Sequence, residues 1–450
     1  MDEALTVHRL HFAFTATFHY LFPQLTMGLA PLIVVCKLLA RLTPGDDDFD
    51  RAARLLGRVF AISFVFGVVT GIPMEFQFGT NWARFSKLSG GIIGQTLAME
   101  GMFAFFLEST FLGLFLFGEQ RLSPRAHLGA AFAVFGGSWL SGYFIVATDA
   151  WMQHPVAFEH VEGGGIRLTS FWGLLLNPWA LVEYVHTMGG ATVTGGFVCA
   201  GLGAYYLLRG RDRRVASVLV QVGVVAAALS SAWQIVPSGD AQGKLVALNQ
   251  PATLATMEGL FHTPPSGAPI VLIGQPDTRA KIIDNSLEVP NILSFLTYRR
   301  WHARISGMDQ FPADALPDNM ALLYYCYHVM VGLGTIMLAV AALALLWLVR
   351  RRLVDSRPIL WALLLSVPLP FIANTAGWFT AEIGRQPWLV YGLMRTQAGT
   401  SNRVSAGNAL FSLLGFMGLY ALLSIVFVLL SAREIARGPG GPPPRATVGH

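Results

Sequence analysis

Residues 320–349 read MALLYYCYHVMVGLGTIMLAVAALALLWLV and contain no Asp, Glu, Lys or Arg. A helix needs about 20 consecutive apolar residues to cross the hydrocarbon core of a bilayer, so this stretch is long enough to span it. Eight further segments qualify, at about 12–40, 59–78, 93–118, 127–148, 180–208, 215–236, 359–379 and 407–430. The short alternating segments of a membrane β-barrel are absent. The sequence therefore predicts an all-α integral membrane protein with about nine transmembrane helices.

The composition of the 450 residues supports this prediction. Hydrophobic residues make up 54% and charged residues 13%, about half of the ~25% charge found in soluble proteins. The net charge of +5 comes from Arg clusters at the ends of the predicted spans. Because these clusters form no single basic face, we exclude nucleic-acid binding. Cys36, Cys199 and Cys326 form no CxxC pair, which excludes an iron–sulfur cluster, a zinc ribbon and a c-type haem.

The distribution of Lys and Arg predicts the orientation and the domain organisation. Alternate connections, together with the C-terminal segment, hold 18 of these residues, whereas the N-terminus and the other short connections hold 7. The positive-inside rule then places the N-terminus outside and the C-terminus in the cytoplasm. We predict helices 1–6 within 1–236, an external segment at 237–319, helices 7–9 within 320–432, and a disordered cytoplasmic tail at 433–450.

Three residues inside the predicted spans could ligate a metal. His19 lies in FHYLFPQLTMG, His186 in EYVHTMGGATVTGG and Met330 in YHVMVGLG. Taken singly, each His could be an interhelical hydrogen-bonding residue and the Met could be core packing. A His and a Met from different spans could instead hold a six-coordinate, low-spin haem.

Carboxylates also fall inside the spans, where a charge is costly and usually functional. Glu100 and Glu108 lie in MEGMFAFFLEST, about 12 Å apart along a regular helix and about 80° apart around it. Two such carboxylates on one helix are typical of a proton relay. Glu183 is another intramembrane acid. Glu382 and Arg385 lie in WFTAEIGRQPW at the end of the eighth span, where they could simply form a weak surface salt bridge.

Together these segments resemble subunit I of the cytochrome bd-type quinol oxidases. The resemblance covers the whole chain, including the span count and the long external segment. Its most specific motif is GRQPW at residues 384–388, preceded by Glu382, and the segments around His19, Glu100, His186 and Met330 follow in the family's order and spacing.

The resemblance implies three haems. His186 and Met330 match the axial pair of a low-spin haem b. His19 and Glu382 match the ligands of two high-spin haems, a haem b and a haem d, and the resemblance does not decide which residue holds which. In some relatives with a similarly short loop, haem b takes the place of haem d. Arg385 matches a basic residue near the haem pair, and His328 stands where the family often carries a propionate-binding Arg.

The resemblance also implies a quinol-binding loop at 237–319 and a terminal oxidase activity. Glu258, in QPATLATMEG, matches the family's acidic quinol-site residue, but Thr253 stands where Lys is common. Quinol would be oxidised at the outer face, and O2 would be reduced to water with cytoplasmic protons delivered by Glu108 and Glu100. The family works with a second membrane subunit of similar size, subunit II, and often with a very small third subunit.

Three other functions use some of the same residues. A proton-coupled secondary transporter could use the intramembrane Glu and His residues, but the sequence shows neither broken helices nor internal pseudo-symmetry. A dihaem cytochrome b anchor usually needs two His pairs, whereas only His19 and His186 lie deep in spans here. A haem-free assembly partner would not need intact ligand positions.

Overall fold

The computed structural model describes residues 3–162 and 165–440. Within that part of the chain, nine helical segments are long and apolar enough to cross a membrane, which confirms the predicted all-α membrane fold. The spans are α1 (Glu3–Leu42), α2 (Asp48–Thr80), α3–η1–α4 (Ala83–Met99, Glu100–Phe105, Phe106–Phe117), α5 (Pro124–Gln153), α7 (Pro178–Leu208), α8–η2–α9 (Arg213–Trp233, Gln234–Ser238, Gly239–Asn249), α12 (Met320–Val349), α13–α14 (Arg357–Leu365, Leu369–Gly384) and α16 (Ala406–Arg437).

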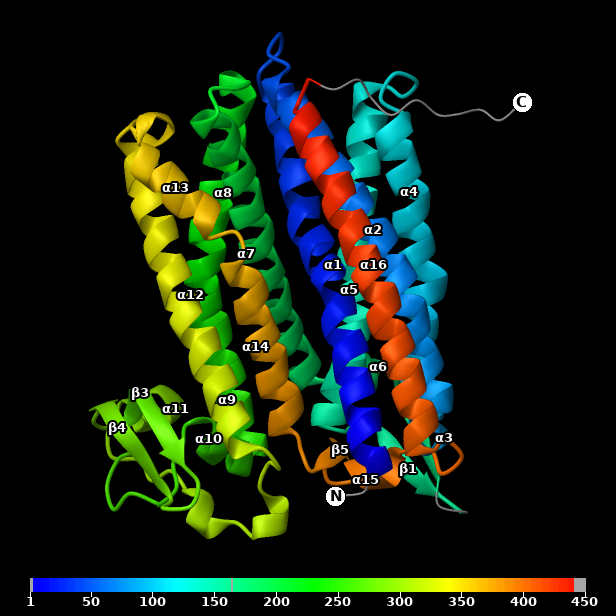
Figure 1. The fold of residues 1–450 in the computed structure, drawn as a ribbon, viewed down its shortest axis with the longest axis vertical. Helices are drawn as coiled ribbons and strands as arrows, with labels where there is room; N and C mark the ends of the chain where they lie inside the picture. The colour runs from blue at the N-terminus through cyan, green and yellow to red at the C-terminus, as the bar shows by residue number, and fades with distance from the viewer. Residues whose placement is uncertain (1–2, 163–164, 441–450) are drawn as a thin grey trace.

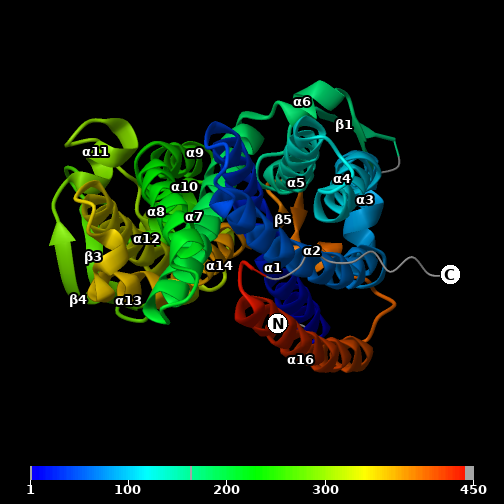
Figure 2. The same cartoon turned by 90° about the horizontal axis from the view of Figure 1, so that it is seen from above.

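The spans form two groups that meet along α1 and α7. Helices α1, α2, α4 and α5 lie on one side, α7, α8, α12 and α14 lie on the other, and α16 packs outside against α1 and α2 (Figures 1 and 2). Glycines allow the two groups to approach closely where α1 and α7 cross. A Cβ atom on Gly28 would lie 2.0 Å from the carbonyl oxygen of Ala191, and one on Gly195 would lie 2.2 Å from that of Gly28. Small residues are the usual means of close helix packing in membranes.

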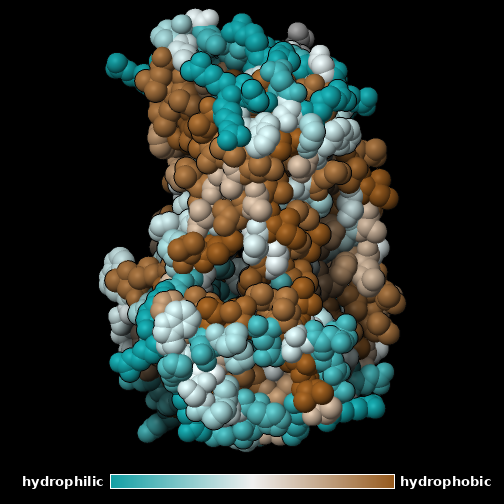
Figure 3. Space-filling view, turned by 90° about the vertical axis from the view of Figure 1, so that its left-hand side faces the viewer, coloured by the Kyte–Doolittle hydropathy of each residue, from teal (hydrophilic) through white to brown (hydrophobic). Residues whose placement is uncertain are grey.

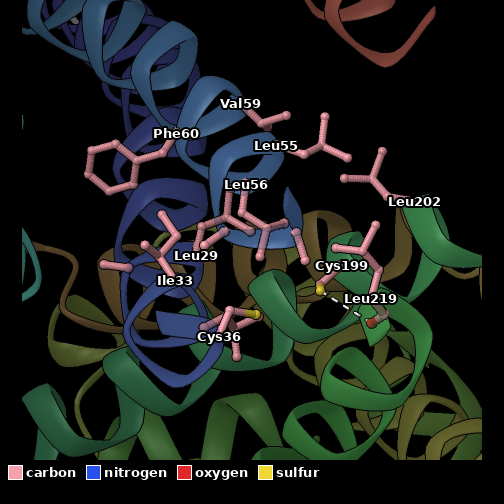
Figure 4. Close-up of a cluster of buried hydrophobic side chains, with 14 of the residues drawn as sticks. Leu29, Ile33, Cys36, Leu55, Leu56, Val59, Phe60, Cys199, Leu202 and Leu219 are labelled. Carbon is pink, nitrogen blue, oxygen red and sulfur yellow. Dashed lines mark hydrogen bonds between the residues drawn. The ribbon is translucent and has the colours of Figure 1, made fainter. Parts of the chain in front are cut away.

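A buried apolar cluster fills the space between these helices. It includes Leu29, Leu56 and Leu219, and the Cys199 thiol donates to the Leu219 carbonyl oxygen at 3.3 Å (Figure 4). All three cysteines are free and buried, so they serve as small core residues. The outward faces are apolar as well, as the exposed Phe411 of α16 illustrates. The side view has a broad apolar surface over the helices and polar surfaces at both ends, as expected for a membrane protein (Figure 3).

The sixth span is longer than the sequence predicts. Its helix continues to Asn249 rather than ending near 236, so the first part of the predicted external segment is helical. Pro237 lacks an N–H group, which would normally interrupt a helix. Here Pro237 lies in the π-helical turn η2, which carries the chain past the proline.

The rest of the segment between the sixth and seventh spans forms a small lobe at the end of the bundle where the N-terminus lies (Figure 1). It comprises α10 (Pro251–Met257), an antiparallel hairpin of β3 (Ile270–Asp277) and β4 (Ile282–Val289), α11 (Ile292–Tyr298), η3 (Met308–Gln310) and η4 (Ala313–Ala315). The other short elements are β1 (Phe158–Val161) with β2 (Gly165–Leu168), α6 (Phe171–Leu175), η5 (Leu353–Asp355), β5 (Trp388–Val390) with β6 (Met394–Arg395), and α15 (Thr396–Gly399).

The last helix also extends past its predicted end. It continues to Arg437, into the segment expected to be a tail from 433, while residues 441–450 of that segment lie outside the described residues. Side chains from other helices hold its final turn. Arg58 pairs with Glu434 at 3.1 Å and donates to the Gly438 carbonyl oxygen at 2.9 Å, and Tyr206 donates to that of Ile435 at 2.7 Å. These bonds satisfy carbonyl groups that a helix end leaves without partners, which explains the extra turn.

Candidate functional site

His186 lies on α7 against the π-helical turn of the sixth span. Its Nδ1 atom is 3.2 Å from the Ser238 hydroxyl, and its Nε2 atom is 3.1 Å from the side-chain nitrogen of Gln234. The Ser238 hydroxyl is within hydrogen-bonding distance of the Trp233 carbonyl, to which it donates. Because that bond uses the Ser238 proton, Nδ1–H of His186 donates to the hydroxyl oxygen. Nε2 is then the basic nitrogen that can bind a metal.

His19 of α1 has the same arrangement. Its Nδ1 atom is 3.1 Å from the Thr70 hydroxyl, and Thr70 donates to the Phe66 carbonyl oxygen at 2.7 Å. Nδ1–H therefore donates to Thr70 and Nε2 keeps its lone pair. A Cβ atom on Gly71 would lie 2.9 Å from Cε1 of His19. The imidazole thus packs against α2 at Gly71, where the helix carries no side chain.

Met330 lies on α12 with its sulfur against α14, where a Cβ atom on Gly377 would come within 2.9 Å of Sδ. Helix α12 packs on α8 and α14, and both of these helices pack on α7. His186 and Met330 therefore come from different sides of one four-helix group (Figure 2). A soft sulfur and a neutral imidazole from different helices are the donor types that would hold a haem, and the missing side chain of Gly377 makes room for the Met330 sulfur.

Both ring nitrogens of His328 lie within hydrogen-bonding distance of backbone carbonyl oxygens. Its Nδ1 atom is 2.8 Å from the Tyr324 carbonyl oxygen and its Nε2 atom is 3.0 Å from that of Val271. The second contact links α12 to strand β3 of the lobe. His328 is thus placed to hold the lobe against the bundle.

Arg385 is a buried cation that lies among three carboxyl residues, of which Asp149 and Glu382 are partly exposed. Its side chain is 2% exposed, Nη1 is 2.7 Å from Asp149, and Nη2 pairs with Glu382. Glu183 of α7 lies close enough to Asp149 of α5 for the two carboxyl groups to interact electrostatically. The interpretation of Glu382 and Arg385 as a weak surface pair is therefore wrong, because the guanidinium is out of water. Asp149 was missed because it lies one residue beyond the predicted end of the fourth span at 148, although an Asp beside an apolar run is a usable signal.

Glu100 begins a π-helical turn, Glu108 lies in the α-helix that follows it, and both residues face α5. Glu100 accepts a hydrogen bond from Ser141 at 2.8 Å, and the buried Glu108 lies beside Ser138. The turn η1 (Glu100–Phe105) adds one residue without advancing the rotation. The two residues are then about 20° apart around the axis rather than the 80° predicted for a regular helix. The π-helical turn thus aligns both carboxyl groups toward the same neighbour.

Glu75 of α2 is a third acid near this pair, close enough to interact electrostatically with Glu100. Sequence reasoning missed Glu75, although it lies within the predicted span 59–78 and the criterion applied to Glu100 would have found it.

Glu258 follows α10 in the lobe and is 3% exposed. It hydrogen-bonds to Tyr327 of α12, and burial raises the pKa of its carboxyl group to about 7. Thr253 donates to the Gly384 carbonyl oxygen at 2.7 Å, which ties α10 to the end of α14. The lobe therefore brings Glu258 close to the helix that carries Met330 and ties α10 to the one that carries Glu382.

Comparison with known proteins identifies the family. Residues 7–439 match the family model described as cytochrome bd terminal oxidase subunit I. The chain belongs to this family. It is 34% identical to a cytochrome bd ubiquinol oxidase subunit 1 of Bacillus subtilis (strain 168), over 96% of this chain and 94% of that protein. It is 32% identical to the cytochrome bd-II ubiquinol oxidase subunit 1 of Escherichia coli (strain K12), over 98% of each.

A solved bd oxidase structure from Geobacillus thermodenitrificans has the same fold. The TM-score is 0.90 at 29% identity, and the match covers 97% of this chain and 100% of that one. Membership in the cytochrome bd family makes this chain an integral membrane subunit of a terminal quinol:O2 oxidoreductase in a respiratory chain, and it implies haem cofactors. The transporter and the dihaem anchor are thereby excluded.

Proposed function

We propose that His186 and Met330 hold a low-spin haem b, and that His19 and Glu382 hold the two high-spin haems, a haem b and either a haem d or another haem b. The observation that carries this proposal is the state of the two imidazoles. In each, a hydroxyl group accepts from Nδ1–H and leaves Nε2 unprotonated. Nε2 of His186 accepts a hydrogen bond from Gln234, which a metal ligand bond would replace. Such hydrogen bonds usually orient metal-binding histidines. When bound, the haems would carry electrons from quinol to O2.

In this proposal, side chains of the protein accept and transfer the protons of the reaction. We propose that quinol binds at the lobe end of the bundle, outside the membrane, and that Glu258 accepts a proton from it. For the reduction of O2, Glu108 and Glu100 would pass cytoplasmic protons toward the site where O2 is reduced, with Ser141 orienting Glu100. The N-terminus would be outside and the C-terminus in the cytoplasm. A second membrane subunit, subunit II, and a very small third subunit would complete the enzyme against the exposed apolar faces.

The proposal is tested by the dithionite-reduced minus air-oxidised visible spectrum of the purified complex. We expect a low-spin b band together with a high-spin band. An additional far-red chlorin band would establish haem d, and its absence would assign haem b to both high-spin sites. A complex without haem absorption would overturn the proposal.

The pKa of Glu258 predicts the pH dependence of quinol oxidation. Burial raises this pKa to about 7, and only the ionised carboxylate can accept a proton. The reactive fraction falls as pH drops below 7, so anaerobic reduction of the low-spin haem by quinol should be about fivefold faster at pH 7 than at pH 6. Stopped-flow absorbance in the intact complex measures this rate. A rate that does not vary between these pH values would contradict the role of Glu258.

Glu100→Gln should separate O2 reduction from quinol oxidation. The amide keeps the size of the side chain but cannot transfer a proton, so we expect O2 consumption to fall at least about 100-fold. Quinol should still reduce the low-spin haem under anaerobic conditions. Glu159→Gln, on the exposed strand β1, is the matched control and should leave both rates unchanged. Persistent O2 consumption in Glu100→Gln would remove Glu100 from the relay.

A further inference from the structure

We propose that Tyr327 is a positioning residue for quinol oxidation, whose hydroxyl group donates to the Glu258 carboxylate and holds it beside the segment of α12 that carries Met330. This inference rests on the proposed role of Glu258 as the proton acceptor.

Helix α10 presents Glu258 to α12 through an apolar contact. Leu254 and Met257 of α10 pack with Leu323 of α12, and Tyr327 packs against the same cluster. Glu258 follows directly after Met257, and its carboxyl group hydrogen-bonds to the Tyr327 side chain. Its other oxygen, Oε2, is buried and has no hydrogen-bond partner among the described residues. We therefore assign the Tyr327 contact to the other carboxylate oxygen, Oε1, which leaves Oε2 available to a substrate hydroxyl.

The helical spacing along α12 places Tyr327, and with it Glu258, near the proposed haem ligand Met330. Tyr327 and Met330 are three residues apart, so their side chains lie on the same side of the helix, about 4.5 Å apart along its axis. His328 is turned by about 100° from Tyr327, and it contacts strand β3 instead. Oxidation of quinol to quinone removes two electrons and two protons from one ring, so a proton acceptor and an electron acceptor must both lie close to it. Tyr327 holds the proposed proton acceptor Glu258 about one helical turn from the proposed haem ligand Met330.

The other polar side chains near Glu258 have partners of their own, so we assign Tyr327 as the polar partner of Glu258. Thr253, at the position where relatives often carry Lys, uses its hydroxyl group to hold the Gly384 carbonyl oxygen. The ring of Tyr324 lies against Gly259, and its hydroxyl is 3.4 Å from the Gly274 carbonyl oxygen. The carboxylates of Glu258 and Glu288 both act on Tyr324 electrostatically. His328 faces the Val271 and Tyr324 carbonyl oxygens, and Arg385 faces Asp149 and Glu382.

The direction of the effect follows from the hydrogen bond. A hydroxyl that donates to a carboxylate stabilises the ionised form and lowers its pKa, which opposes the effect of burial. Removing the hydroxyl should raise the pKa of Glu258. The pH at which quinol oxidation is half-maximal should then move to higher values in Tyr327→Phe, while the rate at high pH is retained.

The experiment measures anaerobic reduction of the low-spin haem by quinol between pH 5.5 and 9 in the whole complex. We expect the midpoint to rise by about one pH unit in Tyr327→Phe and not to move in Tyr325→Phe, a matched change at an exposed position of the same helix. The dithionite-reduced spectrum should be unchanged in both. A midpoint in Tyr327→Phe equal to that of the parent protein would overturn the inference.

Glu258→Gln distinguishes failure of this inference from failure of the proposed function. If Glu258→Gln abolishes the pH dependence but Tyr327→Phe leaves the midpoint in place, only the role of Tyr327 is wrong. If Glu258→Gln keeps both the rate and the pH dependence, Glu258 is not the acceptor and both proposals fall. Infrared difference spectra provide a readout independent of turnover. The carboxyl C=O band that disappears in Glu258→Gln should shift in Tyr327→Phe, and an unshifted band would contradict the hydrogen bond.

Discussion

Met330→Leu is expected to convert the low-spin haem of this subunit into a high-spin form while the protein stays folded. Leucine has nearly the same volume as methionine, so the exchange should cost less than about 1.5 kcal/mol of stability. It lacks the sulfur lone pair, so the iron would lose one of its two axial ligands. The reduced-minus-oxidised visible spectrum and the electron paramagnetic resonance spectrum of the purified complex measure the change.

Met337→Leu is the matched control for this prediction. Met337 lies seven residues further along the same helix and is buried in the apolar core. It has no proposed ligand role, so the low-spin signal should persist. An unchanged low-spin signal in Met330→Leu would remove Met330 from the ligand set. His186→Ala should lose the low-spin signal outright, because the substitution removes the imidazole ligand.

Arg385→Met is expected to destabilise the subunit by about 3–5 kcal/mol, the usual result of removing one partner from a buried ion pair. Arg385 is 2% exposed and pairs with Asp149 and Glu382. Methionine fills a similar space, so the loss comes from partly exposed carboxylates left without their buried cation. Thermal unfolding of the detergent-solubilised complex, followed through haem absorption and tryptophan fluorescence, measures the effect.

Two variants make this prediction specific. Arg395→Met removes an exposed pair with Asp314, and we expect a loss of no more than about 1 kcal/mol. Asp149→Asn in the Arg385→Met background should recover part of the lost stability, because it removes a carboxylate that has no cation. If Arg385→Met were no more destabilising than Arg395→Met, the buried cluster would not contribute to stability as proposed.

The number of spans could be predicted because it depends on local composition alone. The thickness of the bilayer sets the length of each apolar run, and the run at 320–349 agrees with helix α12. The ends of helices were predicted less well. The sixth span continues to Asn249 through a π-helical turn, and α16 continues to Arg437 because Arg58 and Tyr206 cap it. These caps come from distant parts of the chain and leave no local signal.

Part of the candidate site could be predicted, because polar residues inside a membrane span are energetically unfavourable and stand out in an apolar run of sequence. Glu100, His186 and Met330 stand out for this reason, and the GRQPW motif drew attention to Arg385. Their partners did not stand out. Tyr327 reads as one aromatic residue among several in YYCYHVM, and nothing in the sequence indicates that it meets Glu258.

The sequence by itself determined that this protein is a membrane bundle of the cytochrome bd type, because hydropathy and short motifs are properties of neighbouring residues. Only the tertiary structure decided how the charged groups are partnered. Asp149 and Arg385 are 236 residues apart in the chain and meet at 2.7 Å. The π-helical turn after Met99 brings Glu100 and Glu108 onto one side of their helix. Such contacts depend on how helices pack, and packing is a property of the whole chain.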